Sequence, residues 1–239
     1  MLQRPKSYFD NLKNNDMGLF CEIFEDNSYC VLEEEIKGKN VLDLGANIGY
    51  FSLFVDFFEP KKIIAVEPLL EAYIWLYHNT LHINNIEIIK RIVTDKDGDI
   101  QRIYNPKLPG HNNTTNSSIF YPSLGEIVET ISLKTLLSKF TDDNDVVLKM
   151  DIEGSEYDVL MSTARDTMKI ISTLYVEIHP TINPNYKGLE ILREKLFSFG
   201  LEQLYVPPMI VWDGYDENGN KINEKPGTGY CQIEKWKRK

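Results

Sequence analysis

Two short segments carry the residues whose types and spacing could do chemistry. The first is Asp43-Leu-Gly-Ala-Asn-Ile-Gly49, which follows an apolar run and opens an expected helix. Glycines in such a turn let the backbone bend sharply and approach a ligand, and the free N–H groups at a helix start favour the ligand's electronegative end. Glu67 stands 22 positions after Gly45, where a carboxylate can accept hydrogen bonds from both hydroxyls of a ribose. The segment therefore predicts a nucleotide-like cofactor.

The composition of this turn separates two cofactors. NAD binds a G-x-G-x-x-G fingerprint that is tuned to a pyrophosphate, whereas here Asn47 stands two positions after Gly45. Asp43 would also bring a negative charge close to a pyrophosphate. The same charge suits S-adenosylmethionine, which carries a sulfonium and an α-amino group. The turn thus favours a methyltransferase over a dehydrogenase, and a glycine turn without any ligand is the remaining alternative.

The second segment is Asp151-Ile-Glu-Gly-Ser-Glu156, which follows another apolar run. Asp151 ends that run, Glu153 lies in the turn after it, and His179 ends a later run. Ligands of open α/β sheets bind at the carboxyl ends of the strands, so these three residues are the catalytic candidates. Because a hydroxyl acceptor benefits from a base, we expect Glu153 or His179 to be that base and Asp151 to face the methyl group or the methionine amine.

Each of these candidates also has a structural interpretation. Asp151 and Glu153 could cap the start of the next helix, and Glu156 could be a surface residue or a structural partner. His179 could be a hydrogen-bonded structural residue. A further variant has Asp151, Glu153 and His179 holding a divalent metal that polarises the acceptor. We assign no metal on the sequence alone.

Short apolar runs and helical stretches must position these residues. Runs of this length fit strands that are buried on both faces of a parallel sheet. The expected strands are 41–44, 63–66, 86–93, 145–150 and 173–178. Helical spacing is seen over 70–79 and 189–199, and another helix starts within 155–161. This alternation predicts an α/β fold with a doubly wound, mostly parallel sheet.

Two regions interrupt the alternation. Residues 95–135 suggest a small β insertion, with a polar loop that includes Asn112–Ser118. Near the end, 201–206 and 229–234 read as two strands without a helix between them, which suggests an antiparallel hairpin at the sheet edge. The connection 207–229 is rich in Pro, Gly, Asn and Asp, and it should lie over the ligand face because the preceding strand runs parallel to the others. We expect a substrate lid there, with the Asn112–Ser118 loop on the same rim.

The composition sets wider limits. The chain has 239 residues, a formal net charge of −10 and three cysteines. We expect one domain over 1–239, with an N-terminal extension (1–35), a core (36–206 and 228–236) and a lid (207–227). The acidic balance disfavours nucleic acid as a partner, because phosphates are bound by basic surfaces. We find neither a signal peptide nor the roughly 20 apolar residues of a membrane span, and the odd cysteine count disfavours disulfides; we expect a cytoplasmic protein.

Four blocks together resemble the FkbM family of methyltransferases. They occur in the family's order and at familiar distances: Asp43–Ser52, Val66-Glu-Pro68, Val93–Gly98 and Lys149–Glu156. The first block is shared by many methyltransferases, whereas Asp151–Glu156 is the more specific. The resemblance covers about residues 40–200 and leaves out the first 35 residues and the 207–229 segment.

The resemblance implies a fold, a cofactor and an acceptor. The fold is a Rossmann-like class I methyltransferase domain, with a seven-stranded, mostly parallel sheet that ends in an antiparallel hairpin. The donor is S-adenosylmethionine, and the acceptor is usually an oxygen atom, so we expect O-methylation of a hydroxyl on a sugar, a glycan or a small metabolite. A methyltransferase for another atom or a macromolecule, and a non-catalytic cofactor-binding protein, are the alternatives. The cofactor-binding positions expected from the motifs are Asp43, Gly45, Ala46, Asn47, Gly49, Tyr50, Glu67, Pro68, Thr94, Asp95 and Asp151.

Overall fold

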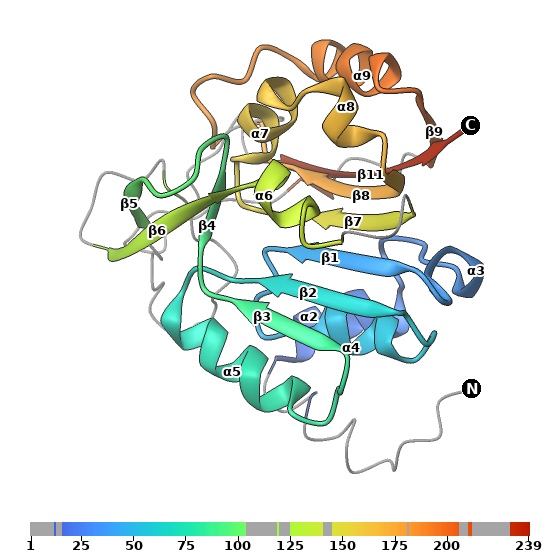
Figure 1. Cartoon of the computed structure of the whole chain (residues 1–239), viewed down its shortest axis with the longest axis vertical. Coiled ribbons are helices and arrows are strands. Elements are labelled where there is room, and N and C mark those ends of the chain that lie inside the picture. Colours follow the sequence, from blue (N-terminus) through green and yellow to red (C-terminus); the bar gives the residue numbers. More distant parts are fainter. Residues whose placement is uncertain are drawn as a thin grey trace.

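A single large sheet runs through the centre of the chain. The computed structural model describes residues 12, 16–103, 119, 125–140, 145–180, 182–205, 210–211 and 230–239. The sheet has the order β10-β11-β8-β7-β1-β2-β3, and β9 pairs with β11 (Figure 1). Its strands are β1 (Asn40–Leu44), β2 (Lys62–Val66), β3 (Ile86–Ile89), β7 (Val146–Met150), β8 (Ile171–Ile178), β9 (Leu201–Tyr205), β10 (Ile210–Val211) and β11 (Tyr230–Arg238).

The strand directions confirm the expected fold class. The pairs β1–β2, β1–β7, β2–β3 and β7–β8 are parallel. Strand β11 is antiparallel to both β8 and β9, so β9 runs in the same direction as the parallel strands. Apart from the two-residue β10, the sheet is therefore the seven-stranded, mostly parallel sheet of a Rossmann-like class I methyltransferase fold, with its antiparallel pair at the C-terminal edge.

One expected strand is two strands in the structure. The run 86–93 divides into β3 and β4 (Ile92–Thr94), which belong to different sheets. Between them, Lys90 and Arg91 form ion pairs with Glu126 and Glu129 of β6 (Glu126–Ser132). Both partners of these ion pairs belong to the small sheet, which the chain enters when it leaves the large one. The small sheet has the order β4-β6-β5, with β5 at Ile100–Ile103, and it confirms a β insertion in this region.

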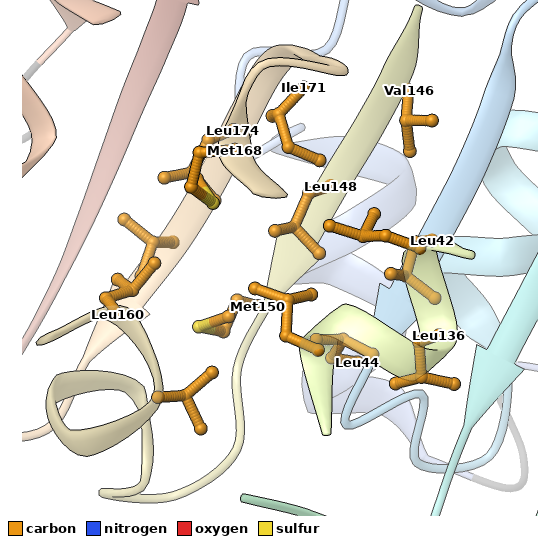
Figure 2. Close-up of a cluster of buried hydrophobic side chains, with 14 of the residues drawn as sticks. Leu42, Leu44, Leu136, Val146, Leu148, Met150, Leu160, Met168, Ile171 and Leu174 are labelled. Carbon is orange, nitrogen blue, oxygen red and sulfur yellow. The ribbon is translucent and has the colours of Figure 1, made fainter. Parts of the chain in front are cut away.

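Helices cover both faces of the large sheet, and alternate residues of each strand face opposite sides. Leu42, Leu148 and Met150 pack on the face covered by α6, α7, α8 and α9 (Figure 2). Val41 and Val147 pack on the other face, together with α4 and the N-terminal segment. The helical elements are α2 (Met17–Phe20), the π-helix η1 (Cys21–Glu25), α3 (Glu33–Ile36), α4 (Tyr50–Asp56), α5 (Leu70–Thr80), α6 (Leu133–Leu137), α7 (Glu156–Ser162), α8 (Arg165–Met168) and α9 (Leu189–Ser198).

The described part of the N-terminal extension packs on the sheet. The ring of Tyr29 lies 5.6 Å from that of Phe51 and 6.4 Å from that of Tyr175. The buried hydroxyl of Tyr175 donates a 2.6 Å hydrogen bond to Glu35, whose other oxygen lies 2.8 Å from Lys235. Apolar and ionic contacts thus join this segment to β8 and β11, and it covers part of the sheet face on which Val41 and Val147 lie.

Some expectations fall on other parts of the chain. The Asn112–Ser118 loop lies outside the described residues. Of the 207–227 lid, the structure describes only β10. Within the described ranges, no helix combines the length and the apolar character that a membrane crossing would need.

Candidate functional site

The carboxyl ends of β1 and β7 bring the two sequence segments together. Backbone N–H of Asp151 donates to the Leu44 carbonyl at 3.1 Å. At Gly45, φ is +72°, and a Cβ there would lie 1.6 Å from the carbonyl oxygen of Asp151. The first glycine of the motif is therefore required by the close approach of two backbone turns. We call residues 45–49 the Gly45 turn.

The rest of the Gly45 turn is fixed by its neighbours. The N–H groups of Gly45 and Ala46 both donate to the Val66 carbonyl at 3.0 Å. At Gly49, φ is +91°, and a Cβ would lie 2.8 Å from Leu76 of α5. Asn47 also has a left-handed backbone, with φ +49°. Packing against Asp151 and α5 thus accounts for both glycines and confirms the sharp turn expected there, while the approach of a ligand stays a prediction.

Glu67 is held rigidly beside this turn. Its carboxylate is 6% exposed and accepts hydrogen bonds from the N–H groups of Asn47 and Leu69, each at 2.9 Å. Burial raises the pKa of Glu67 to about 7, although the two N–H donors and Lys149 lower it. A buried carboxylate with a fixed orientation is thus available at the end of β2.

Beneath the turn lies a buried ion-pair network. Asp43 is fully buried and accepts a 2.7 Å hydrogen bond from the Ser52 hydroxyl. Lys149 Nζ lies 3.6 Å from Asp43, 3.3 Å from Asp151 Oδ2, and 2.8 Å from the Gly45 carbonyl, to which it donates. Burial alone would lower the pKa of Lys149, but Asp151 and Asp43 outweigh it and raise that pKa above its usual value. Burial likewise raises the pKa of Asp43, against the effects of Lys149 and Ser52.

Glu156 organises the second segment. Its side chain is 1% exposed, and it accepts hydrogen bonds from the N–H groups of Ile152 at 2.8 Å and Gly154 at 3.0 Å. His179 Nδ1 lies 3.1 Å from the same carboxylate. Glu156 therefore holds the turn between β7 and α7, as the structural interpretation proposed. Glu153, within this turn, has a left-handed backbone with φ +50°.

The other ring nitrogen of His179 faces three carboxylates. Nε2 lies 3.6 Å from Glu153 Oε2, 3.7 Å from Glu177 Oε1 and 4.0 Å from Asp151 Oδ1. We call these four residues, together with Glu156, the His179 cluster. Burial alone would lower the pKa of His179, but Glu153 and Glu156 outweigh it and raise that pKa well above its usual range. Burial also raises the pKa of Glu153, although His179 lowers it.

Several site residues were missed by the sequence analysis. Glu177 accepts a 3.0 Å hydrogen bond from the Tyr29 hydroxyl. The pKa of Glu22 is raised to about 8, first by burial and then by Glu177 and Asp151, so this carboxyl also lies near the cluster. Lys149 and Glu177 were detectable, because a charged residue inside a buried strand needs a partner. Glu22 and Tyr29 carried no such signal, since they precede every recognisable motif.

The remaining predicted positions are less closely joined to this site. Tyr50 is 1% exposed, and its hydroxyl donates to the Leu12 carbonyl, so this side chain packs against the N-terminal segment. The Thr94 hydroxyl donates to the Lys96 carbonyl and accepts from its N–H. Asp95 is exposed and Pro68 is half-buried. The structure therefore brings the Gly45 turn, Glu67 and the His179 cluster to one edge, whereas the Tyr50 hydroxyl contacts the N-terminal segment and Asp95 is exposed. The cofactor-binding roles of Tyr50 and Asp95 stay predictions.

A family model matches the central part of the chain, and individual proteins are similar to it over longer stretches. Residues 43–201 match the family described as Methyltransferase FkbM domain. Methyltransferase sdnD of Sordaria araneosa is 25% identical, over 79% of this chain and 88% of that protein. A putative RNA methyltransferase from Pyrococcus horikoshii is 14% identical over 99% of this chain and 92% of that one, with a TM-score of 0.45. TehB from Haemophilus influenzae is 14% identical over 92% and 66%, with a TM-score of 0.47.

Proposed function

The chain belongs to the FkbM family of methyltransferases, and from that premise we propose that it methylates a hydroxyl oxygen of a sugar, a glycan or a small metabolite. The donor is S-adenosylmethionine. This cofactor supplies a methyl group on a sulfonium sulfur, which the acceptor oxygen takes up as it loses its proton. The chain's own residues must therefore hold the donor, orient the acceptor and receive that proton.

The residues at the Gly45 turn suit this donor. Glu67 presents a buried carboxylate whose orientation is fixed by two N–H groups, and carboxylate oxygens are acceptors for the paired hydroxyls of a ribose. Half-buried Gly45 and Asn47 leave part of the turn open beside it. On the β7 side, Asp151 supplies negative charge for a sulfonium or an ammonium group. We propose that these residues hold the donor.

Glu153 is the proposed proton acceptor. It lies in the turn after β7, and its carboxylate is 18% exposed, so it is sheltered but still within reach of an acceptor. His179 is held at Nδ1 by Glu156, 3.1 Å away, which makes it a better candidate for a positioning residue of the cluster than for the base. A positioned base contributes about 10²–10⁴-fold to such a reaction.

The observation that carries this proposal is the double role of Asp151. Its backbone packs against Gly45, and its side chain faces His179 Nε2 at 4.0 Å. A donor held at the Gly45 turn would therefore lie next to an acid–base cluster, as methyl transfer to oxygen requires. Alignment of the two reactants can contribute about 7–11 kcal/mol to the rate.

The test begins with labelled S-adenosylmethionine and small-molecule extracts. We expect label to enter an ether-linked methyl group of an organic-soluble or sugar product. Once the acceptor is known, Glu153→Gln should lower kcat by about 10²-fold or more, and His179→Asn should lower it less. Label transferred only to protein or nucleic acid, or near wild-type turnover by both variants, would contradict the proposal.

A further inference from the structure

The geometry around His179 Nε2 does not fit a set of hydrogen bonds. The side chain of His179 is 11% exposed and its Nε2 points at carboxylate oxygens 3.6, 3.7 and 4.0 Å away. These distances exceed those of hydrogen bonds. Each of these oxygens therefore lies as far from Nε2 as a second ligand of the same ion would, because two atoms each about 2.1 Å from a metal lie roughly 3–4 Å apart. Ligand atoms of Asp151, Glu156 and His179 also lie within 4.8 Å of one another.

Each side chain that points into the cluster has a polar partner on the atom that points away from it. Glu156 holds His179 at Nδ1, 3.1 Å away, so the ring presents Nε2 to the cluster. Lys149 holds Asp151 at Oδ2, which turns Oδ1 inward. Tyr29 donates to Glu177 Oε2, which turns Oε1 inward. Residues that bind a metal are usually oriented in this way by partners on their outer atoms.

The ligand chemistry selects the kind of ion. Carboxylate oxygens with one imidazole nitrogen suit an oxygen-preferring divalent ion such as Mg²⁺ or Mn²⁺, whereas thiolate ligands, which soft metals prefer, are absent from this cluster. Glu156 is an outer partner because its carboxylate already accepts from Ile152 and Gly154. Among the described contacts, Glu153 has no comparable outer partner, and it stays available for the proton.

We propose that the His179 cluster binds one Mg²⁺ or Mn²⁺ ion through His179 Nε2, Asp151 Oδ1 and Glu177 Oε1. These residues come from the ends of β7 and β8, beside the turn that faces the donor. Such an ion keeps further positions for oxygen atoms of another molecule.

The consequence for the acceptor rests on the proposed function. The ion would polarise the acceptor hydroxyl and ease its deprotonation by Glu153. An acceptor with two neighbouring oxygens, such as a vicinal diol or a hydroxy acid, fits this arrangement better than an isolated alcohol. A sugar ring meets that requirement.

Binding of Mn²⁺ alone to the full chain tests the site without any acceptor. After chelator treatment, we expect electron paramagnetic resonance titration to show one bound Mn²⁺ per chain, which Mg²⁺ displaces. Asp151→Asn and His179→Gln should each weaken binding at least tenfold, in line with the loss of a ligand. Glu34→Gln, at an exposed position of α3, is the matched control and should bind as the wild type does.

A second measurement needs no variant. Pulsed electron paramagnetic resonance of the wild-type chain with Mn²⁺ should show coupling to an imidazole nitrogen. Absence of that coupling, absence of Mn²⁺ binding, or equal binding by folded Asp151→Asn and the wild type would overturn the inference. Calorimetry with S-adenosylmethionine on the same sample separates the metal site from the proposed function. Donor binding without Mn²⁺ binding overturns only the metal site. Mn²⁺ binding without donor binding overturns only the proposed function.

Discussion

The Gly45 turn and the His179 cluster lie at the same edge of the sheet but are held by different forces. In the turn, backbone N–H groups and left-handed residues fix the shape, and Gly45 has no room for a side chain. In the cluster, buried charges on separate elements fix each other's positions. A donor common to a whole family suits the first kind of site. The second kind of site can change one side chain at a time, because its shape does not depend on the backbone of a single turn.

The largest expected effect is a loss of stability at Gly45, where a backbone contact fixes the shape of the turn. Gly45→Ala would put a Cβ 1.6 Å from the Asp151 carbonyl oxygen, so it should lower the free energy of unfolding by about 5 kcal/mol or prevent folding. Gly98→Ala is the matched control, since φ is +75° there but nothing lies within 4 Å of the added Cβ. It should cost only about 1 kcal/mol. Urea unfolding measures both, and equal losses would show that the turn is not set by this backbone contact.

The next effect concerns the ion-pair network that joins the two regions. Lys149→Met would leave fully buried Asp43 and half-buried Asp151 without their cation, which should cost about 3–4 kcal/mol. Adding Asp43→Asn should restore part of that loss, because one uncompensated charge is removed. Thermal or urea unfolding of the single and double variants gives the coupling. Simple additivity would mean that Lys149 does not link the turn to the cluster.

The pH dependence of stability tests Glu67. Its pKa is about 7 in the folded chain against 4.5 normally, so between these values the folded chain holds a proton that the unfolded chain releases. Stability should therefore fall as pH rises from 4.5 to about 7, with a contribution from Glu67 of at most about 3 kcal/mol. Glu67→Gln should make the free energy of unfolding depend less on pH in this range, even if the variant is more or less stable than the wild type at every pH. An unchanged slope in urea unfolding between pH 5 and 7 would contradict the burial of this carboxylate.

The smallest expected effect concerns the N-terminal segment. Tyr29→Phe removes the hydroxyl that holds Glu177, at a cost of about 1 kcal/mol in stability. Turnover should fall by several-fold, because Glu177 would lose its orientation. Tyr77→Phe, on the exposed face of α5, is the comparison variant. If both variants lose turnover equally, the N-terminal segment does not contribute to the site.

The same contrast explains how far sequence reasoning reached. Backbone demands leave visible marks, so the turn at Asp43–Gly49 could be predicted from its glycines, and the apolar runs predicted β1, β2, β7 and β8. The cofactor-binding role of Glu67 stays a prediction. The division of 86–93 into two strands was missed. It lies at Lys90 and Arg91, whose ion-pair partners in β6 lie more than 30 positions further along the chain. Periodicity within one run contains no such information.

The cluster was recovered only in part for a related reason. Asp151, Glu153 and His179 each end or follow an apolar run, and their positions could be predicted from strand ends. Tyr29 reaches Glu177 across 148 positions, from a segment without a recognisable motif. Contacts of that range depend on how the N-terminal segment packs, which requires the folded structure.

Calorimetry with S-adenosylmethionine tests the central claim most directly. The titration is best made at pH 8, above the pKa of about 7 of Glu67, where its carboxylate is ionised. We predict one donor molecule bound per wild-type chain with a micromolar Kd, and at least tenfold weaker binding by Glu67→Gln. An absence of binding by the folded wild-type chain, or the same Kd for both proteins, would contradict the account.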